Sequence, residues 1–175
     1  MANLILYYSR KGENYVNGGI QTLSKGNTKR VAEFIQKAVG GELFEVEPTR
    51  EYSASYMTCI KEAQAEQRAN ERPAVKKLPE SLDGYDTIFI GAPVWWGDWP
   101  MIMYTGFENN DFAGKTLIPF STHEGSGLSG FDRKLSSACP DSTVLDGLAV
   151  RGNDAQNDQE SVREAVETWV SGLGY

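Results

Sequence analysis

The sequence has only two cysteines and one histidine among its 175 residues, and it has no long apolar run. Cys59 and Cys139 lie far apart and match no CxxC pattern, so we expect both to be reduced thiols in a cytoplasmic protein. His123 alone cannot build a multi-histidine metal site, and no ligands with metal-site spacing accompany it. No stretch approaches the roughly 18 apolar residues of a membrane span. The first residues indicate a strand rather than a signal peptide, because they lack a basic region and a cleavage site.

Positive charge is also scarce, since 17 Lys and Arg residues face 24 Asp and Glu residues and leave a net charge of −7. A chain without a basic stripe is not expected to bind nucleic acid, because phosphate neutralisation dominates that affinity. The acidity suits docking on a basic partner protein, since complementary fields raise association rates. Plain solubility explains the same charge equally well.

What the sequence does contain is an alternation of strand-like and helix-like segments, with no repeat or linker. Apolar runs predict five strands at residues 3–8, 43–46, 87–91, 115–121 and 142–150. Start and stop signals predict five helices: one opened at 26–28 and stopped at Gly40, one at 55–68, one with Pro100 at its first position, one at 127–138, and a closing one that has an apolar face from Val162 to Val170 and ends at Gly172. Such strands indicate a doubly wound parallel α/β sheet, here in a single domain, residues 1–175. Ligands should then bind in the loops after the first, third and fourth strands.

The first of these loops begins at Ser9 and ends in Gly26-Asn27-Thr28, where a helix starts. Free backbone N–H groups and the positive end of the helix dipole make such a terminus an anion site. Gly26 allows a close backbone approach, and the three polar side chains add donors. An ordinary N-cap is the alternative reading, since Asn and Thr cap helices routinely.

An insertion at residues 11–25 separates the two ends of this loop, although a βα turn needs only a few residues. Glycines at its ends and middle indicate turns, and Tyr15, Val16, Ile20 and Leu23 could form a hairpin-like flap. Such a flap could cover an anion or offer a surface to a partner. A tolerated surface insertion is the simpler reading, because loop length costs little entropy.

The second loop, "GAPVWWGDWP", follows a buried strand and holds adjacent tryptophans, Trp95 and Trp96. One of them could stack on a flat ligand ring while the other packs inward. Gly97 supplies a peptide unit that can rotate cheaply. Aromatic side chains that merely close the end of the sheet remain an alternative.

The third loop, "STHEGSGLSG", combines glycines and hydroxyl residues into a flexible rim rich in hydrogen-bond donors. His123 could contact a ligand or donate a proton near pH 7, or it could be a plain surface histidine. Gly125, Gly127 and Gly130 spell G-x-G-x-x-G, but only one strand and one helix follow, so a dinucleotide fingerprint is not expected.

With these three loops in order, the whole chain resembles the flavodoxin family, which binds flavin mononucleotide (FMN). The resemblance rests on "PVWWG" after the third strand, "THEGSG" after the fourth, and the phosphate pattern Ser-x-Thr-Gly-Asn-Thr, matched by Ser9 and Gly26-Asn27-Thr28. It departs from the family in the interrupted phosphate loop, in Lys25 at a hydroxyl position, and in His123-Glu124 where many members carry a tyrosine.

The resemblance implies a five-stranded sheet of order 2-1-3-4-5, FMN as cofactor and electron transfer to partner proteins with a basic docking face. An NAD(P)H-dependent flavin or quinone oxidoreductase of the same fold is the alternative, and a module that has lost its cofactor is a third possibility. The implied cofactor-binding residues are Ser9, Arg10, Gly26, Asn27, Thr28, Pro93, Val94, Trp95, Trp96, Gly97, Thr122, His123, Glu124, Gly125, Ser126 and Gly127.

Overall fold

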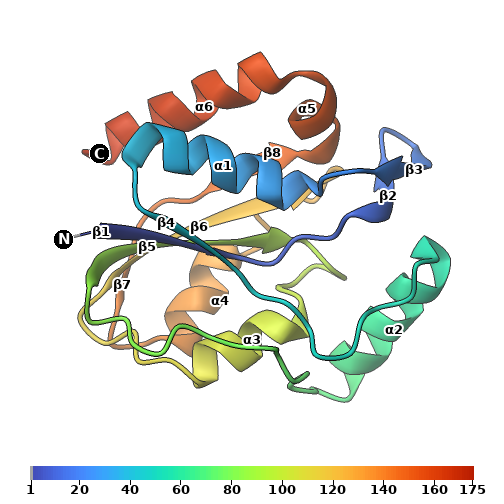
Figure 1. Cartoon of the computed structure of the whole chain (residues 1–175), viewed down its shortest axis with the longest axis horizontal. Coiled ribbons are helices and arrows are strands. Elements are labelled where there is room, and N and C mark those ends of the chain that lie inside the picture. The colour runs from blue at the N-terminus through green and yellow to red at the C-terminus, as the bar shows by residue number, and fades with distance from the viewer. Residues whose placement is uncertain (1) are drawn as a thin grey trace.

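The computed structural model describes residues 2–175, which form a parallel sheet with helices on both faces (Figure 1). The sheet contains β1 (Ala2–Tyr7), β4 (Glu42–Glu45), β5 (Tyr85–Pro93), β6 (Thr116–His123), β7 (Thr143–Val144) and β8 (Leu148–Arg151). A separate hairpin consists of β2 (Gly12–Val16) and β3 (Gly19–Leu23). The helices are α1 (Asn27–Val39), α2 (Tyr56–Arg68), α3 (Met101–Glu108), α4 (Phe131–Ala138), α5 (Gly152–Asn157) and α6 (Gln159–Gly172).

The order of the strands is β4-β1-β5-β6-β7, with β8 also paired to β6, and all of these pairings are parallel. With the hairpin set aside, this is the predicted order 2-1-3-4-5, so the predicted fold is confirmed. From β1 the chain crosses to β4 on one side and then to β5 on the other. The order therefore reverses at β1 and β5, where ligands of open α/β sheets bind.

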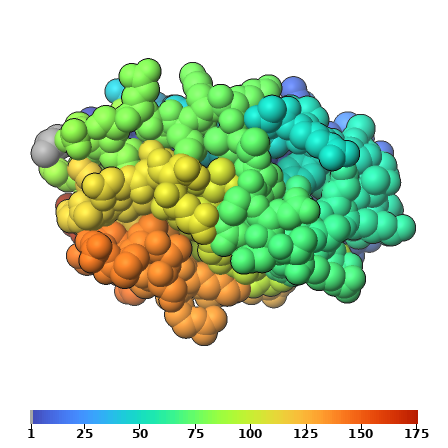
Figure 2. Space-filling model, turned by 90° about the horizontal axis from the view of Figure 1, so that it is seen from below, coloured from blue at the N-terminus to red at the C-terminus, as the bar shows by residue number. Residues whose placement is uncertain are grey.

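Two hydrophobic cores cover the two faces of the sheet, because successive strand residues point to opposite sides. In β1, Leu4 and Leu6 pack on the side of α3 and α4, whereas Ile5 and Tyr7 pack on the side of α1 and α6. Figure 1 shows α1 and α6 above the sheet and α3 and α4 below it. Seen from below, α3 and α4 lie side by side, and α2 lies at one end of the molecule (Figure 2).

The predicted strand at 142–150 is wrong in one respect, because it is two short strands. β7 pairs with Thr116 and Leu117, and β8 pairs with β6 from Phe120 onward. The break lies opposite Pro119, which has no backbone N–H to donate to a neighbouring strand. Two short strands, β7 and β8, therefore share the edge of the sheet beside β6.

Two helix starts also differ from the prediction. The helix predicted from residue 127 begins at Phe131, because Gly127, Ser129 and Gly130 have φ values of 66°, 52° and 70°, which a right-handed helix does not allow. Pro100 precedes α3 rather than opening it, since its ψ of 141° is extended. The short helix α5 was not predicted. No helix among residues 2–175 combines the length and apolarity needed to cross a membrane.

The insertion forms the predicted hairpin, in which β2 and β3 pair antiparallel from Gly12 and Leu23 to Val16 and Gly19. Its turn is Asn17-Gly18, with φ values of 50° and 84°. Two positive φ angles define the type I′ turn, which matches the twist of a two-residue hairpin and favours Asn-Gly. The local sequence thus specifies the turn of this hairpin.

Candidate functional site

A cavity of about 260 Å³ lies where the three predicted loops meet. It is bounded by the N-terminus of α1, the segment after β5 and the segment after β6. Most of the predicted cofactor-binding residues line it: Arg10, Asn27, Thr28, Pro93, Val94, Trp95, Thr122, His123, Glu124 and Ser126. The three loops that the sequence singled out thus lie together around one cavity.

The start of α1 forms the first wall of this cavity. The Oγ of Ser9 accepts a hydrogen bond from the backbone N–H of Lys29 at 3.1 Å. A Cβ on Gly26 would overlap this hydroxyl and the carbonyl oxygen of Arg10, so only glycine allows the chain to pass here. The N–H groups of Asn27 and Thr28 belong to the first turn and therefore have no partner within the helix. The cavity thus faces a donor-rich helix terminus.

A buried pair of hydroxyl groups joins the first wall to the third loop. Thr28 Oγ1 lies 2.7 Å from Thr122 Oγ1, and both residues are buried. Asn27 is held as well, because its Oδ1 accepts a hydrogen bond from Gln156 Nε2 at 2.8 Å. α5 carries Gln156, so this unpredicted helix orients a predicted binding residue.

His123 presents one ring nitrogen to its own loop. Its Nδ1 accepts a hydrogen bond from the backbone N–H of Gly125 at 2.9 Å. Burial lowers the pKa of His123 below its ordinary value, and the Arg151 guanidinium acts in the same direction, while Glu124 opposes them. A neutral ring with Nδ1 as the acceptor carries its proton on Nε2. His123 can therefore donate one hydrogen bond to a ligand near pH 7.

Glu124, also a predicted cofactor residue, has its carboxylate engaged by the protein. It accepts hydrogen bonds from the backbone N–H groups of Asn17, at 3.1 Å, and Asn153, at 2.8 Å. Arg151 forms an ion pair with it at 3.5 Å. These contacts connect the hairpin tip, the third loop and α5. Glu124 therefore holds these three segments together at the rim of the cavity. The two N–H groups and Arg151 balance its negative charge.

The tryptophan loop turns sharply, with reciprocal backbone hydrogen bonds between Trp95 and Asp98 and positive φ angles at Trp96 and Gly97. Trp95 packs inward with edge-to-face contacts to Tyr8 and Tyr52, at centroid distances of 5.3 and 5.1 Å. The inward packing predicted for one of the two tryptophans is thus observed for Trp95. Trp96, however, points away from the cavity.

Trp96 is held on α2 by two hydrogen bonds. Its indole Nε1 donates to the carbonyl of Ile60 at 2.8 Å, and its own carbonyl accepts from Gln67 at 3.2 Å. The carbonyl of Gly97 accepts a hydrogen bond from Lys134 Nζ at 2.6 Å. Neither Trp96 nor Gly97 lines the cavity, so a contact between them and a ligand stays a prediction.

The cavity also has a side that sequence reasoning missed. Asn14 and Tyr15 of the hairpin and Tyr56 at the start of α2 contribute to its lining. The hairpin pattern was visible in the sequence, but nothing there showed which way it folds. Tyr56 begins a weakly amphipathic helix whose position depends on tertiary contacts.

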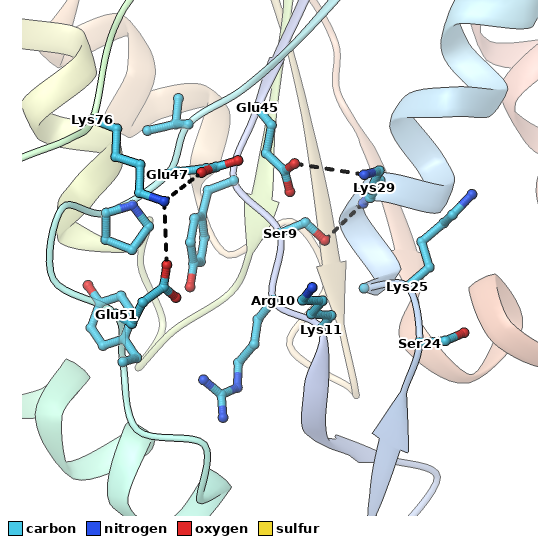
Figure 3. Close-up of a pocket in the computed structure, with 15 residues that line it drawn as sticks. Ser9, Arg10, Lys11, Ser24, Lys25, Lys29, Glu45, Glu47, Glu51 and Lys76 are labelled. Atoms are coloured by element: carbon cyan, nitrogen blue, oxygen red, sulfur yellow. Dashed lines mark hydrogen bonds and ion pairs between the residues drawn. The ribbon is translucent and has the colours of Figure 1, made fainter.

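A larger cavity of about 440 Å³ includes Ser9 and Gly26 in its lining and has a strongly charged rim. Figure 3 shows Glu47 and Glu51 bound to Lys76 on one side and Lys29 facing Glu45 on the other. Lys29 and Lys76 are thus paired with carboxylates of the same rim. A flavin ring requires flat, apolar walls, so we assign the smaller cavity as the candidate cofactor site.

The remaining predicted residues take supporting positions. Ser9 and Gly26 line the larger cavity, and neither Gly125 nor Gly127 is part of the smaller cavity's lining. Both cysteines are free and buried, and burial raises the pKa of each thiol to about 11. Within residues 2–175, no group of three or more His, Cys, Asp or Glu side chains could hold a metal ion.

Comparisons with known proteins agree with this geometry. The sequence pattern of flavodoxins matches residues 21–171. A Bacteroides uniformis protein, described as a flavoprotein, is 30% identical over 97% of both chains with a TM-score of 0.75. One from Bacteroides eggerthii is 27% identical over 95% of this chain and 96% of its own, with a TM-score of 0.73.

A flavoprotein of Lactobacillus acidophilus, whose structure contains FMN, is 23% identical over 91% of this chain and 98% of its own, with a TM-score of 0.63. No curated protein sequence matches the chain. The pattern match spans most of the described residues and includes the start of α1, the tryptophan loop and the third loop. The chain belongs to the flavodoxin family.

Proposed function

We propose that this chain binds FMN and carries electrons between redox partner proteins. The observation that carries the proposal is the smaller cavity, which joins an anion-binding helix terminus to an aromatic, apolar wall. FMN has one phosphate at one end and a flat ring at the other. A site with these two ends in one cavity matches that shape, and the FMN complex of the Lactobacillus acidophilus relative supports the same cofactor.

The residues of the cavity divide into two groups by chemistry. Arg10, Asn27 and Thr28 would hold the phosphate, because they combine N–H donors, a hydroxyl and the positive end of the α1 dipole. Pro93, Val94 and Trp95 offer apolar surface to the ring, and Thr122 to Ser126 offer polar groups to its pyrimidine edge. The cavity holds about 260 Å³, so one edge of the ring should stay at the surface.

Bound FMN would supply one- and two-electron transfer. The chain contributes the electrostatic setting for this chemistry. Its net charge of −7 disfavours a further negative charge at the site, so we expect a low potential for the second electron. An exposed ring edge would allow electrons to pass to a docked protein without a substrate pocket.

Apolar side chains beside the cavity offer a docking area for such a partner. Tyr15 and Ile20 of the hairpin, Met57 of α2 and Trp96 of the second loop are all between 44% and 51% exposed. Exposed large side chains in one neighbourhood are typical of interaction sites. Together with the acidic charge, they suit a partner with an apolar centre and a basic rim.

Flavin titration of the purified protein tests the binding step, and stepwise reduction tests the function. We expect FMN uptake, followed by slow reduction with NAD(P)H alone and fast reduction when a flavodoxin reductase is added. Rapid quinone reduction by NAD(P)H alone would support the oxidoreductase of the same fold instead. A colourless protein that takes up no FMN on titration would refute the proposal.

A further inference from the structure

We infer that the β2–β3 hairpin and the first turn of α2 form a fourth wall of the cofactor cavity, in which the rings of Tyr15 and Tyr56 contact the flavin ring. The inference rests on the proposed FMN site. It assigns cofactor contacts to two residues that lie outside the three loops of the family pattern. It also gives the insertion at 11–25 a role in binding.

The lining of the cavity is the first support. Besides the three loops, only the hairpin and the first turn of α2 add side chains to it within the described residues, namely Asn14, Tyr15 and Tyr56. The two tyrosine rings lie 6.3 Å apart, centroid to centroid, and are inclined by 25°. They are therefore stacked on each other from two separate elements, and both add aromatic groups to the lining. Aromatic faces of this kind stack well on flat conjugated rings.

A network of hydrogen bonds holds this wall in place. The Arg10 guanidinium donates to the carbonyl of Glu13, on the hairpin, at 2.9 Å, and to the carbonyl of Ser53, before α2, at 2.9 Å. The Glu13 carboxylate accepts a hydrogen bond from the backbone N–H of Tyr56 at 2.8 Å. A carboxylate at a helix N-terminus is favoured by the helix dipole. Hairpin and helix are thus fastened to each other and to the phosphate loop.

The opposite end of the hairpin is fastened as well. Asn17 lies in the turn of the hairpin, and its backbone N–H donates a hydrogen bond to the carboxylate of Glu124 in the third loop. The hairpin therefore spans from α2 to the third loop and closes the cavity between them. Figure 1 shows the hairpin and α2 beyond the end of the sheet at which the candidate loops lie.

The position of Trp96 is the second, independent support. Aromatic side chains beside a flat conjugated ring contribute binding energy, and of the two adjacent tryptophans only Trp95 lines the cavity. Hydrogen bonds to Ile60 and Gln67 hold Trp96 against α2, and it is not part of the cavity lining. Tyr15 and Tyr56 occupy the cavity side, so they supply the aromatic surface in its place.

The test measures dissociation constants for FMN and riboflavin with the Y15L and Y56L variants of the full chain. We expect each variant to weaken FMN binding by about tenfold, the scale of one lost aromatic stack. Riboflavin binding should weaken by the same factor, because the wall acts on the ring and not on the phosphate. Y15F and Y56F keep the ring and should retain wild-type affinity.

T22A serves as the matched control, because Thr22 lies on the hairpin but not in the cavity lining. Limited proteolysis reports whether Y15L loosens the hairpin. If it does, Y56L carries the test, since it leaves β2 and β3 unchanged. Wild-type affinity in both Leu variants overturns the inference, and so does a loss confined to FMN or a larger loss in W96L. Failure of the wild-type chain to bind FMN would instead refute the proposed function.

Discussion

Thr28 and Thr122 lie 94 positions apart in the chain, yet their hydroxyl oxygens are 2.7 Å apart at the floor of the candidate cofactor cavity. One comes from the first turn of α1 and the other from the end of β6. Because both side chains are buried, each hydroxyl depends on the other for its hydrogen bond. The pair therefore sets the separation of the two loops that would grip the two ends of FMN.

Valine at either of these positions should destabilise the protein. T28V and T122V each leave a buried hydroxyl without its partner, and we expect the free energy of unfolding to fall by about 1–3 kcal/mol. The double variant should lose less than the sum of the two, because it removes both groups. Urea unfolding of the four proteins gives the coupling energy, and strict additivity would show that the hydroxyl pair contributes nothing.

The close approach of Gly26 to Ser9 and Arg10 predicts that no side chain larger than that of glycine fits at position 26. The added methyl group of G26A would overlap Ser9 and Arg10, so we expect a loss of about 1–3 kcal/mol in stability together with weaker FMN binding. G19A is the matched control, because a Cβ on Gly19 meets no atom within 4 Å. Thermal unfolding and FMN titration measure both effects. Equal behaviour of the two variants would contradict this close approach.

The contacts of the Glu124 carboxylate with Asn17 and Arg151 predict that this side chain holds the tip of the hairpin in place. Glutamine at this position loses the charge that attracts Arg151 and weakens the hold on the hairpin tip. We expect E124Q to be cut faster within residues 17–19 by a nonspecific protease, with a modest loss of stability of about 1 kcal/mol. E80Q changes an exposed carboxylate in a distant loop and should behave as wild type. Unchanged cleavage in E124Q would argue against this role.

The half-buried ring of His123 predicts a pH dependence of stability. Because burial lowers its pKa in the folded state, the unfolded chain binds the proton more readily. Its contribution to stability is therefore complete above pH 6.5, the ordinary pKa of histidine, and is lost as the pH falls through the folded pKa. Urea unfolding between pH 8 and pH 5 should show a larger loss for wild type than for H123Q. Parallel curves for the two proteins would contradict this origin.

The alternation of apolar strands and amphipathic helices predicted the parallel sheet and the three loops, whereas the order of the strands came from the resemblance to flavodoxins. The sheet and the loops follow from local patterns, such as the glycines around the α1 start and the Asn17-Gly18 turn. The break between β7 and β8 had a local signal as well, since Pro119 in β6 lies opposite the break and has no N–H to donate. A single apolar run at 142–150 concealed it.

The features that sequence reasoning missed depend on contacts between distant segments. Trp96 points outward because α2 offers the carbonyl of Ile60 and the amide of Gln67. Tyr56 reaches the cavity because Glu13 binds its backbone N–H. Neither contact has a local signature, and the polar helix at 56–68 has no periodicity strong enough to fix its position. Tertiary contacts alone decide which aromatic residues face the cavity.

The hairpin begins and ends at neighbouring points of the fold, since Gly12 pairs with Leu23 and Arg10 touches Gly26. Its entry and exit therefore lie side by side, and we expect an exchange of the segment between them to leave the strands of the main sheet in place. Flavodoxins with different segments between β1 and α1 would then share the same sheet and helices. They would differ in their affinity for the cofactor and in the protein that they bind. The hairpin of this chain, twelve consecutive residues from 12 to 23, would then be one of several alternative segments at this position.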